Sequence, residues 1–486
     1  MSQEYYLGCY ENFIDGKWAP ALSGATLDIY CPCNGELVSS IPASDKSDVN
    51  AAIASAKRAF YEEDWAFNPR LRSTVLMKWA AAMRANLETL ARALALETGK
   101  PIAEARFEIN GSIGYMEYYA SAARTLYGGT TAVDSSSLSV LSREPVGVVA
   151  GITPWNYPIT LMMRDLAPAL AAGNTIVIKS AQQTTACTLE VVRLLKDVPM
   201  LPRGVINAVS GKGSVIGNVL SEHPDVDMIS FTGSVEVGKS LTRSASETMK
   251  KLSLELGGKS PNIVFADANI EKALPYAIKA VFTNAGQLCT SGTRLVIEES
   301  IADEFLARLK GMAESLKLGF CMDENTQMGP VVSKAQLETV LGYIEDGLKT
   351  GTLVTGGRRV TENGLDKGYF VAPTIIKNPA HDSRIVQEEI FGPVLVVETF
   401  RTEQEAVEIA NGTEFGLAGA VWTKDIDKAM RVARKVRSGS MWVNCYNKLF
   451  PECETGGYKQ SGVDRAGGVE GIMKYTEVKH ICVDFA

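Results

Sequence analysis

The feature that most constrains the fold is a regular alternation of short apolar strands and helical segments that starts near residue 146. Strands are predicted over residues 146–152, 175–179, 204–209 and 228–231, with helices over 161–171, 184–195 and 213–221 between them. Strands that alternate with helices in this way favour a parallel, doubly wound sheet. We therefore predict an α/β fold.

The remainder of the chain predicts a second lobe of the same type and a helical start. Strands over 262–265 and 294–297 alternate with helices over 270–282 and 301–316, and helices are predicted over 46–62, 70–97 and about 103–124. Between residues 125 and 145, glycine pairs and a triple serine separate short β-like segments. A chain of 486 residues is long enough for two or three domains.

Composition and charge exclude several classes of function. The net charge of −7 without a long basic run argues against a nucleic-acid or membrane-surface partner. No apolar run approaches the ~20 residues of a membrane span, and no secretory signal is visible, so we expect a protein of the cytoplasm.

Metal chemistry is not expected from the sequence. The three histidines (His223, His381 and His480) are far apart and no zinc motif is present. The nine cysteines show no disulfide framework. Cys31 and Cys33 are separated by one residue, which is neither a zinc nor a redox spacing.

Two segments carry reactive side chains. Cys289 follows a predicted helix among glycine and small polar residues, which suits a nucleophile, although a free cysteine is most often a small buried hydrophobe. Glu255 lies between two leucines and precedes Gly257 and Gly258. An apolar setting raises a carboxyl pKa and would suit a general base, whereas the alternative is a solvated carboxylate before a glycine turn.

Two further segments follow predicted strands directly. Asn156, within Pro-Trp-Asn-Tyr-Pro, follows the first strand of the alternation, and its amide could donate to an oxyanion. The alternative is a rigid proline-bracketed turn. Gly233 and Ser234 open a helix after another strand, a position that suits a phosphate group.

Taken together and in order, these motifs resemble the aldehyde dehydrogenase superfamily from about residue 13 to 483. The motifs are PWNYP (154–158), FTGS (231–234), LELGGKSP (254–261), GQLCTSGTR (286–294), EEIFGPV (388–394), GGYKQSG (456–462) and YTEVKH (475–480). The resemblance implies that the Cys289 thiolate attacks an aldehyde, that Asn156 and the Cys289 N–H hold the oxyanion, and that Glu255 activates water to hydrolyse a thioester.

The resemblance also implies an aldehyde dehydrogenase-like fold, with two doubly wound α/β lobes plus a β oligomerisation arm. The dinucleotide-binding domain would comprise residues 1–124 and 146–257, and the catalytic domain residues 258–471. Residues 125–145 and 472–486 would form the arm. Because an exposed two-stranded arm needs a partner for stability, a homodimer or homotetramer is expected.

The cofactor implied by the resemblance is NADP or NAD. The residues carried over to this role are Ile152, Trp155, Lys179, Ser180, Gln182, Gly233, Ser234, Glu389 and Phe391. Many NAD-specific members place a glutamate where this chain has Gln182, and that carboxylate would repel a 2′-phosphate. NADP is therefore favoured, with Ser180 as a further donor, although Gln182 could equally bond the ribose hydroxyls of NAD.

Substrate preference is predicted from positions where the chain departs from many relatives. Arg164 replaces a tunnel tryptophan, as in succinic semialdehyde dehydrogenases, but their second arginine is replaced by Thr283. Aromatic residues expected near the substrate are Tyr157, Trp442 and Phe450. A polar semialdehyde ranks first, an aryl or pyridyl keto-aldehyde second, and cationic betaine-type aldehydes lower because Arg164 would repel them.

Two other functions fit the motifs less well: transfer of the acyl group to coenzyme A, and a structural protein without catalysis. Relatives that release the acyl group to coenzyme A generally lack a competent base, so Glu255 favours hydrolysis. A structural protein that had lost catalysis should show damage to the Cys–Glu–Asn set, which is intact. A second relay glutamate of many relatives is replaced by Ala466, and no role is assigned to Glu470.

Overall fold

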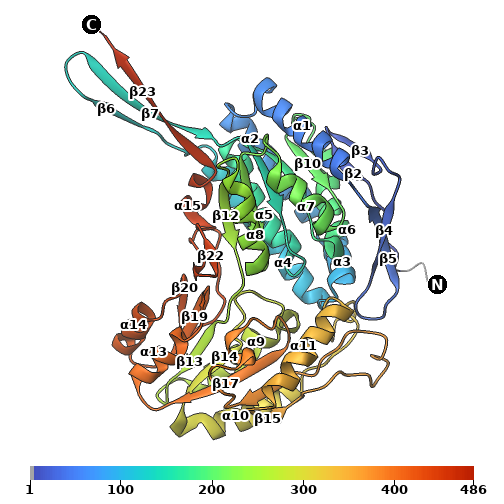
Figure 1. Ribbon diagram of the computed structural model, residues 1–486, viewed down its shortest axis with the longest axis vertical. Coiled ribbons are helices and arrows are strands. Elements are labelled where there is room, and N and C mark those ends of the chain that lie inside the picture. Colours follow the sequence, from blue (N-terminus) through green and yellow to red (C-terminus); the bar gives the residue numbers. More distant parts are fainter. Residues whose placement is uncertain (1–4, 486) are drawn as a thin grey trace.

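The computed structural model describes residues 5–485, which form two α/β lobes and a projecting arm of strands (Figure 1). Residues 1–4 and 486, at the ends of the expected first domain and arm, lie outside the described residues. None of the helices within residues 5–485 has the length and hydropathy of a membrane-crossing segment.

The first lobe contains an eight-stranded sheet in the order β22-β12-β11-β8-β9-β10-β2-β3. Its parallel strands are β8 (Val148–Ile152), β9 (Thr175–Lys179), β10 (Ile206–Val209), β11 (Met228–Thr232) and β12 (Lys251–Glu255). Its antiparallel edges are β2 (Asn12–Ile14), β3 (Lys17–Ala19) and β22 (Gly462–Val463).

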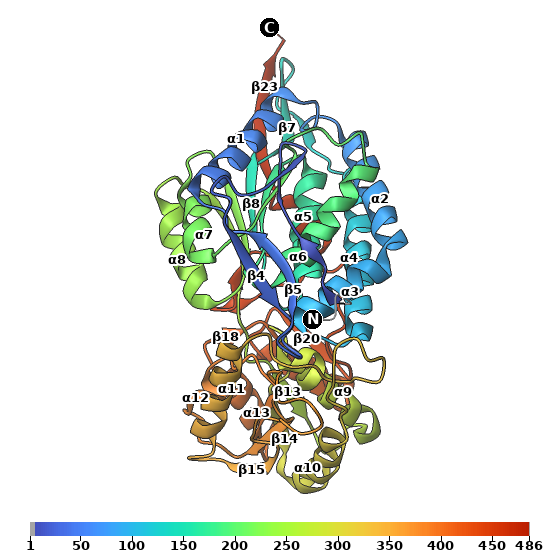
Figure 2. The ribbon, with the colours of Figure 1, turned by 90° about the vertical axis from the view of Figure 1, so that its right-hand side faces the viewer.

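Helices cover both faces of this sheet (Figure 2). These helices are α1 (Lys46–Glu62), α2 (Pro69–Ala85), α3 (Leu87–Thr98), α4 (Ile102–Ala122), α5 (Pro158–Ala172), α6 (Thr185–Arg193), α7 (Gly213–Glu222) and α8 (Val235–Ser246). Along β8, Val149 packs into the core beneath α2–α5, whereas Val148 and Ala150 pack into the core beneath α1, α7 and α8. This period-two alternation between two buried faces is the physical basis of the doubly wound arrangement.

The second lobe repeats the plan around a seven-stranded sheet in the order β15-β16-β17-β14-β13-β19-β20. The strands are β13 (Pro261–Val264), β14 (Arg294–Glu298), β15 (Thr352–Thr355), β16 (Thr374–Lys377), β17 (Val394–Phe400), β19 (Ala418–Trp422) and β20 (Ser440–Val443). The main helices are α9 (Ile270–Phe282), α10 (Glu299–Glu314), α11 (Lys334–Gly347), α13 (Glu403–Asn411) and α14 (Ile426–Lys435), with shorter α12 (Arg384–Gln387) and α15 (Gly468–Met473).

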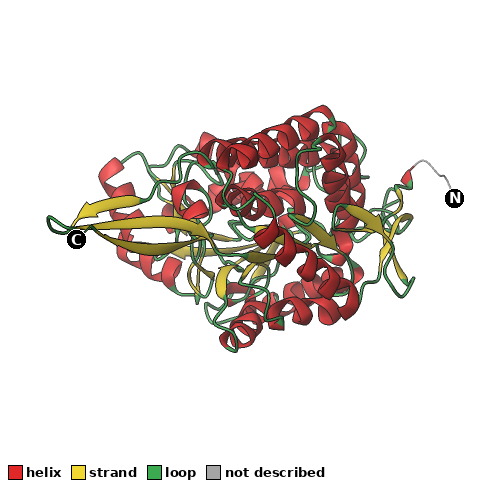
Figure 3. Ribbon diagram, turned by 90° about the horizontal axis from the view of Figure 1, so that it is seen from above, coloured by secondary structure: helices red, strands yellow, loops and turns green. Residues whose placement is uncertain are grey.

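The arm is a three-stranded antiparallel sheet that projects from the body (Figure 3). It is built from β6 (Gly129–Ala132), β7 (Ser137–Pro145) and β23 (Thr476–Asp484), with β7 in the centre. Side chains of β6 are all exposed, and most of β23 is exposed. Two smaller sheets complete the fold. One contains β1 (Gly8–Cys9), β4 (Thr26–Tyr30) and β5 (Leu37–Pro42), and the other pairs β18 (Phe415–Gly416) with β21 (Tyr458–Lys459).

Two elements differ from the expectation. The single helix predicted over 70–97 is wrong, because Asn86 leaves helical geometry (φ −113°, ψ 22°) and separates α2 from α3. The apolar spacing continues across this break, so the pattern could not show it. The strand β22 lies beyond residue 258 in the chain and yet pairs with β12, where Leu254 faces Val463. The predicted domain boundaries themselves stay a prediction.

Candidate active site

The carboxyl ends of four neighbouring parallel strands meet at the edge of the first sheet that faces the second lobe. Their registers align Ile152 with both Lys179 and Phe231, and Thr232 with Glu255. Ligands bind at this edge in open α/β sheets. Most of the candidate residues on the first lobe therefore share one edge because of the strand register.

Cys289 lies in the loop that follows α9 and the short helix η4 (Thr283–Gly286). Hydrogen bonds within the loop and to neighbouring segments hold it in place. The Gln287 amide donates to Asn284 O at 2.9 Å and accepts from Val332 N at 2.8 Å, and Tyr446 OH donates to Thr290 O at 2.9 Å. Asn284 adopts a left-handed conformation (φ 50°), which sharpens the turn before the cysteine.

Asn156 is brought to the same loop from the first lobe. Its Nδ2 donates to Gln287 O at 2.9 Å, two residues before Cys289. Because a side-chain amide has two N–H groups, the second remains as a donor for another oxygen. The contact between lobes therefore places a candidate oxyanion donor beside the candidate nucleophile.

The backbone of Asn156 is fixed by charged residues that the sequence analysis missed. Its carbonyl accepts from Lys100 Nζ at 2.7 Å and from Asn284 Nδ2 at 3.1 Å. Lys100 is fully buried and pairs with Glu108 at 2.5 Å. Glu108 also accepts from the backbone N–H of Ile159 at 2.9 Å. The sequence gives no sign of this role for Lys100, because the partner of a buried charge is set by the tertiary structure.

The pKa values of Cys289 and Glu255 are both shifted by burial and by Arg164. Burial raises the pKa of the Cys289 thiol to about 12, while the Arg164 guanidinium lowers it and the carboxylates of Glu389 and Glu255 raise it. Burial also raises the pKa of Glu255, and Arg164 opposes this shift. Glu255 is only 6% exposed, so the solvated-carboxylate alternative does not hold.

Arg164 interacts with protein groups around Glu255. Its Nη1 is 3.8 Å from Glu255 Oε2 and its Nη2 donates to Thr232 Oγ1 at 2.9 Å. Asp165 lies 3.9 Å from Arg164 Nε, and Lys474 Nζ lies 3.8 Å from Asp165. The four charges form a buried alternating series. Lys474 could not have been found from the sequence, because it is distant in the chain and belongs to no motif.

Lys179, Ser180 and Gln182 place polar side chains at the carboxyl end of β9. Burial lowers the pKa of Lys179 to about 8. Gly213, the first residue of α7, lies beside Lys179, because a Cβ at this glycine would be 3.6 Å from Lys179 Nζ. Ser180 is buried and its hydroxyl lies 3.1 Å from that of Thr185, whereas Gln182 begins the short helix η2 (Gln182–Thr184) and is partly exposed.

Gly233 and Ser234 connect β11 to the start of α8. Gly233 N donates to Glu255 O at 3.0 Å, and a Cβ at Gly233 would approach the Phe231 ring to 2.3 Å. Ser234 is the N-cap of the twelve-residue helix α8 and accepts from Val237 N at 3.3 Å. A helix N-terminus at a sheet's ligand-binding edge is suited to an anionic group.

Glu389 and Phe391 reach the same region from the second lobe. Glu389 accepts from Gly258 N at 3.0 Å, and burial raises the pKa of its carboxyl to about 7. Phe391 adopts φ 57°, which is uncommon for a bulky residue, and contacts Trp155 edge-to-face at 5.2 Å. This contact joins two of the expected cofactor residues across the lobes, near Ile152 at the end of β8.

The expected substrate residues lie in different environments. Tyr157 is partly buried, with Lys100 Nζ 3.8 Å from its ring centroid. Trp442 is buried in the second lobe against Tyr446 and donates to Lys448 O at 3.0 Å, whereas Phe450 is 53% exposed in a surface loop. Their roles stay predictions.

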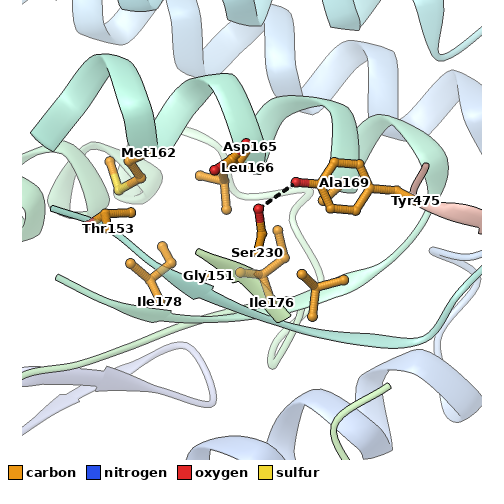
Figure 4. Close-up of a pocket in the computed structure, with 11 residues that line it drawn as sticks. Gly151, Thr153, Met162, Asp165, Leu166, Ala169, Ile176, Ile178, Ser230 and Tyr475 are labelled. Carbon is orange, nitrogen blue, oxygen red and sulfur yellow. Dashed lines mark hydrogen bonds between the residues drawn. The ribbon is translucent and has the colours of Figure 1, made fainter. Parts of the chain in front are cut away.

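A small void beneath α5 is unsuited to a substrate. Figure 4 shows Thr153, Met162 and Asp165 around it, with Tyr475 OH donating to Ser230 Oγ at 3.0 Å. Its free volume is about that of one water molecule.

Comparisons with known proteins agree with this architecture. The partly buried thiol of Cys289 and the buried side chains of Glu255 and Asn156 meet between two doubly wound α/β lobes. The model of the aldehyde dehydrogenase family matches residues 18–481, and the chain belongs to this family of oxidoreductases.

Relatives and solved structures are similar over almost their whole length. A betaine aldehyde dehydrogenase from Bacillus subtilis is 44% identical over 96% of this chain and 96% of its own. An aldehyde dehydrogenase from Emericella nidulans is 39% identical over 96% and 94%. The structure of a betaine aldehyde dehydrogenase from Staphylococcus aureus in complex with NAD+ matches with a TM-score of 0.96 and 38% identity, covering 98% and 95% of the two chains.

Proposed function

We propose that this protein oxidises an aldehyde to a carboxylic acid with NAD or NADP, through a thioester on Cys289. The observation that carries the proposal is the hydrogen bond between Asn156 Nδ2 and Gln287 O, which joins the amide of one lobe to the cysteine loop of the other. Glu255, at the end of a neighbouring strand, lies close enough for its charge to raise the Cys289 pKa.

The first half-reaction begins at the Cys289 sulfur. With a pKa of about 12 the thiol is protonated at neutral pH, so its proton must leave as the sulfur attacks the aldehyde carbon. The Glu255 carboxylate is the neighbouring base that can take it, through water. The oxyanion is held by the second N–H of Asn156 and by the Cys289 backbone N–H. A bound nicotinamide cofactor would supply the hydride acceptor that converts the tetrahedral adduct on Cys289 to a thioester.

The second half-reaction hydrolyses this thioester. Glu255 first releases the thiol proton to solvent. Its carboxylate then removes a proton from water, the water oxygen adds to the acyl carbon, and the C–S bond breaks to give the carboxylic acid and the Cys289 thiolate. Burial raises the pKa of Glu255, which makes its carboxylate a stronger base than an exposed glutamate. In this chain Ala466 is buried and has no titratable group, so Glu255 acts without the second relay acid of many relatives.

Cofactor binding is supported by two features of the first lobe and one of the second. The Lys179 ammonium would contact the adenine ribose, and the N-terminus of α8 with Gly233 and Ser234 would hold the pyrophosphate. Glu389 would accept from the nicotinamide ribose, with Trp155, Phe391 and Ile152 packed around it.

We further propose that NADP is accepted alongside NAD, and is favoured, because Gln182 carries no charge that would repel a 2′-phosphate. Ser180 contributes less than expected, since its hydroxyl is buried and interacts with Thr185. The Staphylococcus aureus structures contain NAD+, so the comparison of both cofactors on this chain is the relevant measurement.

The favoured substrate is a polar semialdehyde, with Arg164 as the cation near the reacting centre. A betaine-type aldehyde is the second candidate, because the Bacillus subtilis relative at 44% identity is a betaine aldehyde dehydrogenase. Carboxylate oxygens of Glu255 and Asp165 at 3.8 and 3.9 Å offset the charge of Arg164, which weakens the repulsion expected from the sequence.

The exposed arm supports a homo-oligomer, as a dimer or tetramer. Within the described residues, β6 and β23 each have one neighbouring strand, so each presents an unpaired edge. Such edges are usually covered in the native assembly. All nine cysteines are free, which suits the reducing environment of the cytoplasm.

The test is a kinetic matrix of aldehydes against both cofactors, read as NAD(P)H absorbance. We expect turnover with at least one semialdehyde, and its abolition in Cys289→Ala with cofactor binding retained. Cys453→Ala removes an exposed thiol and is the matched control, with unchanged turnover expected. Activity that survives Cys289→Ala would refute the mechanism.

A further inference from the structure

Three cysteines outside the active site converge in the core of the first lobe. The sulfur atoms of Cys31, Cys33 and Cys321 all lie within 4.8 Å of one another. Among residues 5–485, no other three His, Cys, Asp or Glu side chains bring possible ligand atoms so close together. The three residues are 2%, 4% and 0% exposed. We call them the thiol cluster.

The thiol cluster joins segments that are distant in the chain. Cys31 and Cys33 lie in the turn between β4 and β5, where Gly35 N donates to Cys31 O at 2.8 Å. Cys321 lies in the loop between α10 and α11, and its carbonyl accepts from the N–H of Ile102, the first residue of α4, at 2.8 Å. The cluster is therefore built only when the second lobe's loop docks on the first lobe.

Tight packing holds the thiol cluster in place. A Cβ at Gly99 would approach Pro32 Cγ to 2.7 Å and Pro330 Cγ to 2.8 Å, and a Cβ at Gly368 would approach Cys33 O to 2.4 Å. The backbone of both contributing loops is thus confined before any ligand binds. A preformed site loses little conformational entropy on binding.

The geometry suits a thiophilic ion. Three sulfurs in a plane at about 2.3 Å from a central ion lie about 4.0 Å from one another. The present separations of at most 4.8 Å reach this arrangement through sulfur shifts of less than about 1 Å. Cysteine sulfur selects soft ions such as Cu(I) and Zn(II) over hard ones.

Ion binding requires the three thiols to lose their protons. Metal ligands must be thiolates, and binding releases the protons.

We propose that Cys31, Cys33 and Cys321 form a buried binding site for one soft, thiophilic metal ion with three sulfur ligands. The ion enters while the loops dock during folding, because the sulfurs are closed off in the folded chain. It ties the 318–322 loop to the turn between β4 and β5. Cys33 Sγ lies 3.8 Å from Gly99 O, and the next residue, Lys100, holds the Asn156 carbonyl. Metal binding therefore stiffens the same junction that supports Asn156.

The experiment measures metal binding rather than catalysis, so it is independent of the proposed function. Full-length Cys289→Ala protein, which lacks the active-site thiol, is refolded in reductant with either Cu(I) or Zn(II) and then passed through a desalting column. We expect one ion per chain in at least one arm, and an X-ray absorption spectrum with three sulfurs at about 2.3 Å. Thermal unfolding should shift to a higher temperature in the loaded protein.

The variant that removes the ligands is Cys31→Ala/Cys33→Ala/Cys321→Ala in the same background. It should lose the bound ion, while Cys187→Ala, which removes a buried cysteine outside the cluster, should retain it. If the triple variant does not fold, Cys321→Ala alone is used, which leaves two sulfurs. Loss of a residue that only orients a metal ligand lowers metal affinity by about 10–100-fold, so the loss of a ligand itself should lower it further.

Three results would overturn the proposal. These are less than one tenth of an ion per chain in both arms, the same stoichiometry in the ligand variants, and a disulfide within the cluster that persists in reductant. The disulfide is detected as a mass two hydrogens lower, in the peptides that carry these cysteines.

Discussion

Replacement of Arg164 by leucine tests the electrostatic coupling at the centre of the site. At 3.8 Å, the attraction between Arg164 and the Glu255 carboxylate is about 4 kcal/mol at an effective dielectric constant of about 20. One pKa unit corresponds to about 1.4 kcal/mol, so the full interaction would equal about 3 units. Asp165 is also freed from Arg164, and water entering the vacated space screens the remaining charges. We therefore expect the Glu255 pKa to rise by about one to two units.

The direction of the change in the pH–rate profile depends on the role of Glu255 as a base. Only the carboxylate accepts a proton, so deacylation is fast above its pKa and slow below it. A higher pKa moves the acidic limb of the steady-state pH–rate profile upward by the same one to two units. At a fixed pH on that limb, turnover falls by about 10- to 100-fold.

The assay must separate Glu255 from Cys289, because Arg164 also lowers the pKa of the thiol. The pre-steady-state burst of NAD(P)H reports acylation by Cys289, and the steady state that follows reports deacylation. Arg164→Lys keeps a positive charge and is the matched control, with a profile close to that of the parent protein. The Arg164→Leu variant could instead lose affinity only for carboxylate-bearing aldehydes, with an unchanged pH–rate profile. That result would refute the electrostatic coupling between Arg164 and Glu255 and would support a role of Arg164 in binding the substrate carboxylate.

The remaining predictions concern other parts of the proposed mechanism. Glu255→Gln should give a burst of about one NAD(P)H per active site and then stall; an unchanged steady state would contradict its role as base. Asn156→Ala should lower the acylation rate by about 10²–10³, as is typical for one oxyanion donor, and an unchanged burst rate would argue against it. Gln182→Glu should raise the KM for NADP at least about tenfold while leaving NAD kinetics near normal; equal effects on both cofactors would contradict the assignment. Deletion of residues 476–486 should lower the mass measured by light scattering to that of a smaller assembly, and an unaltered mass would exclude the arm from the interface.

Much of the fold could be predicted from local patterns. The helix over 46–62, the strand over 175–179 and the helix over 270–282 were each predicted with the bounds that the structure shows. Their periodicity reflects burial on one face or two, which neighbouring residues encode directly. The break at Asn86 between α2 and α3 was not predictable in this way, because apolar residues continue at helical spacing on both sides of it.

The candidate site was predictable where its residues belong to motifs at strand ends. Glu255, Asn156 and Cys289 each lie in a short segment whose position relative to a strand or helix indicates its chemistry. The buried charges that support the site could not be predicted, because neither Lys100 nor its partner Glu108 lies in a motif that indicates a function. The role of a buried charged residue depends on its partner, and here the packing of helices determines the partners.

The amino-acid sequence alone determined that the chain has alternating strands and helices, and a cysteine, a glutamate and an asparagine in motif contexts. Only the tertiary structure decided which groups meet. The one-residue spacing of Cys31 and Cys33 suggests nothing, yet Cys321 completes a cluster with them from the other lobe. Arg164, predicted to face a substrate carboxylate, interacts with Glu255 and Thr232 of its own chain. The physical reason is that periodicity is a property of neighbouring residues, whereas pKa values and ligand geometry depend on atoms a few ångströms apart in space, whatever their separation in the chain.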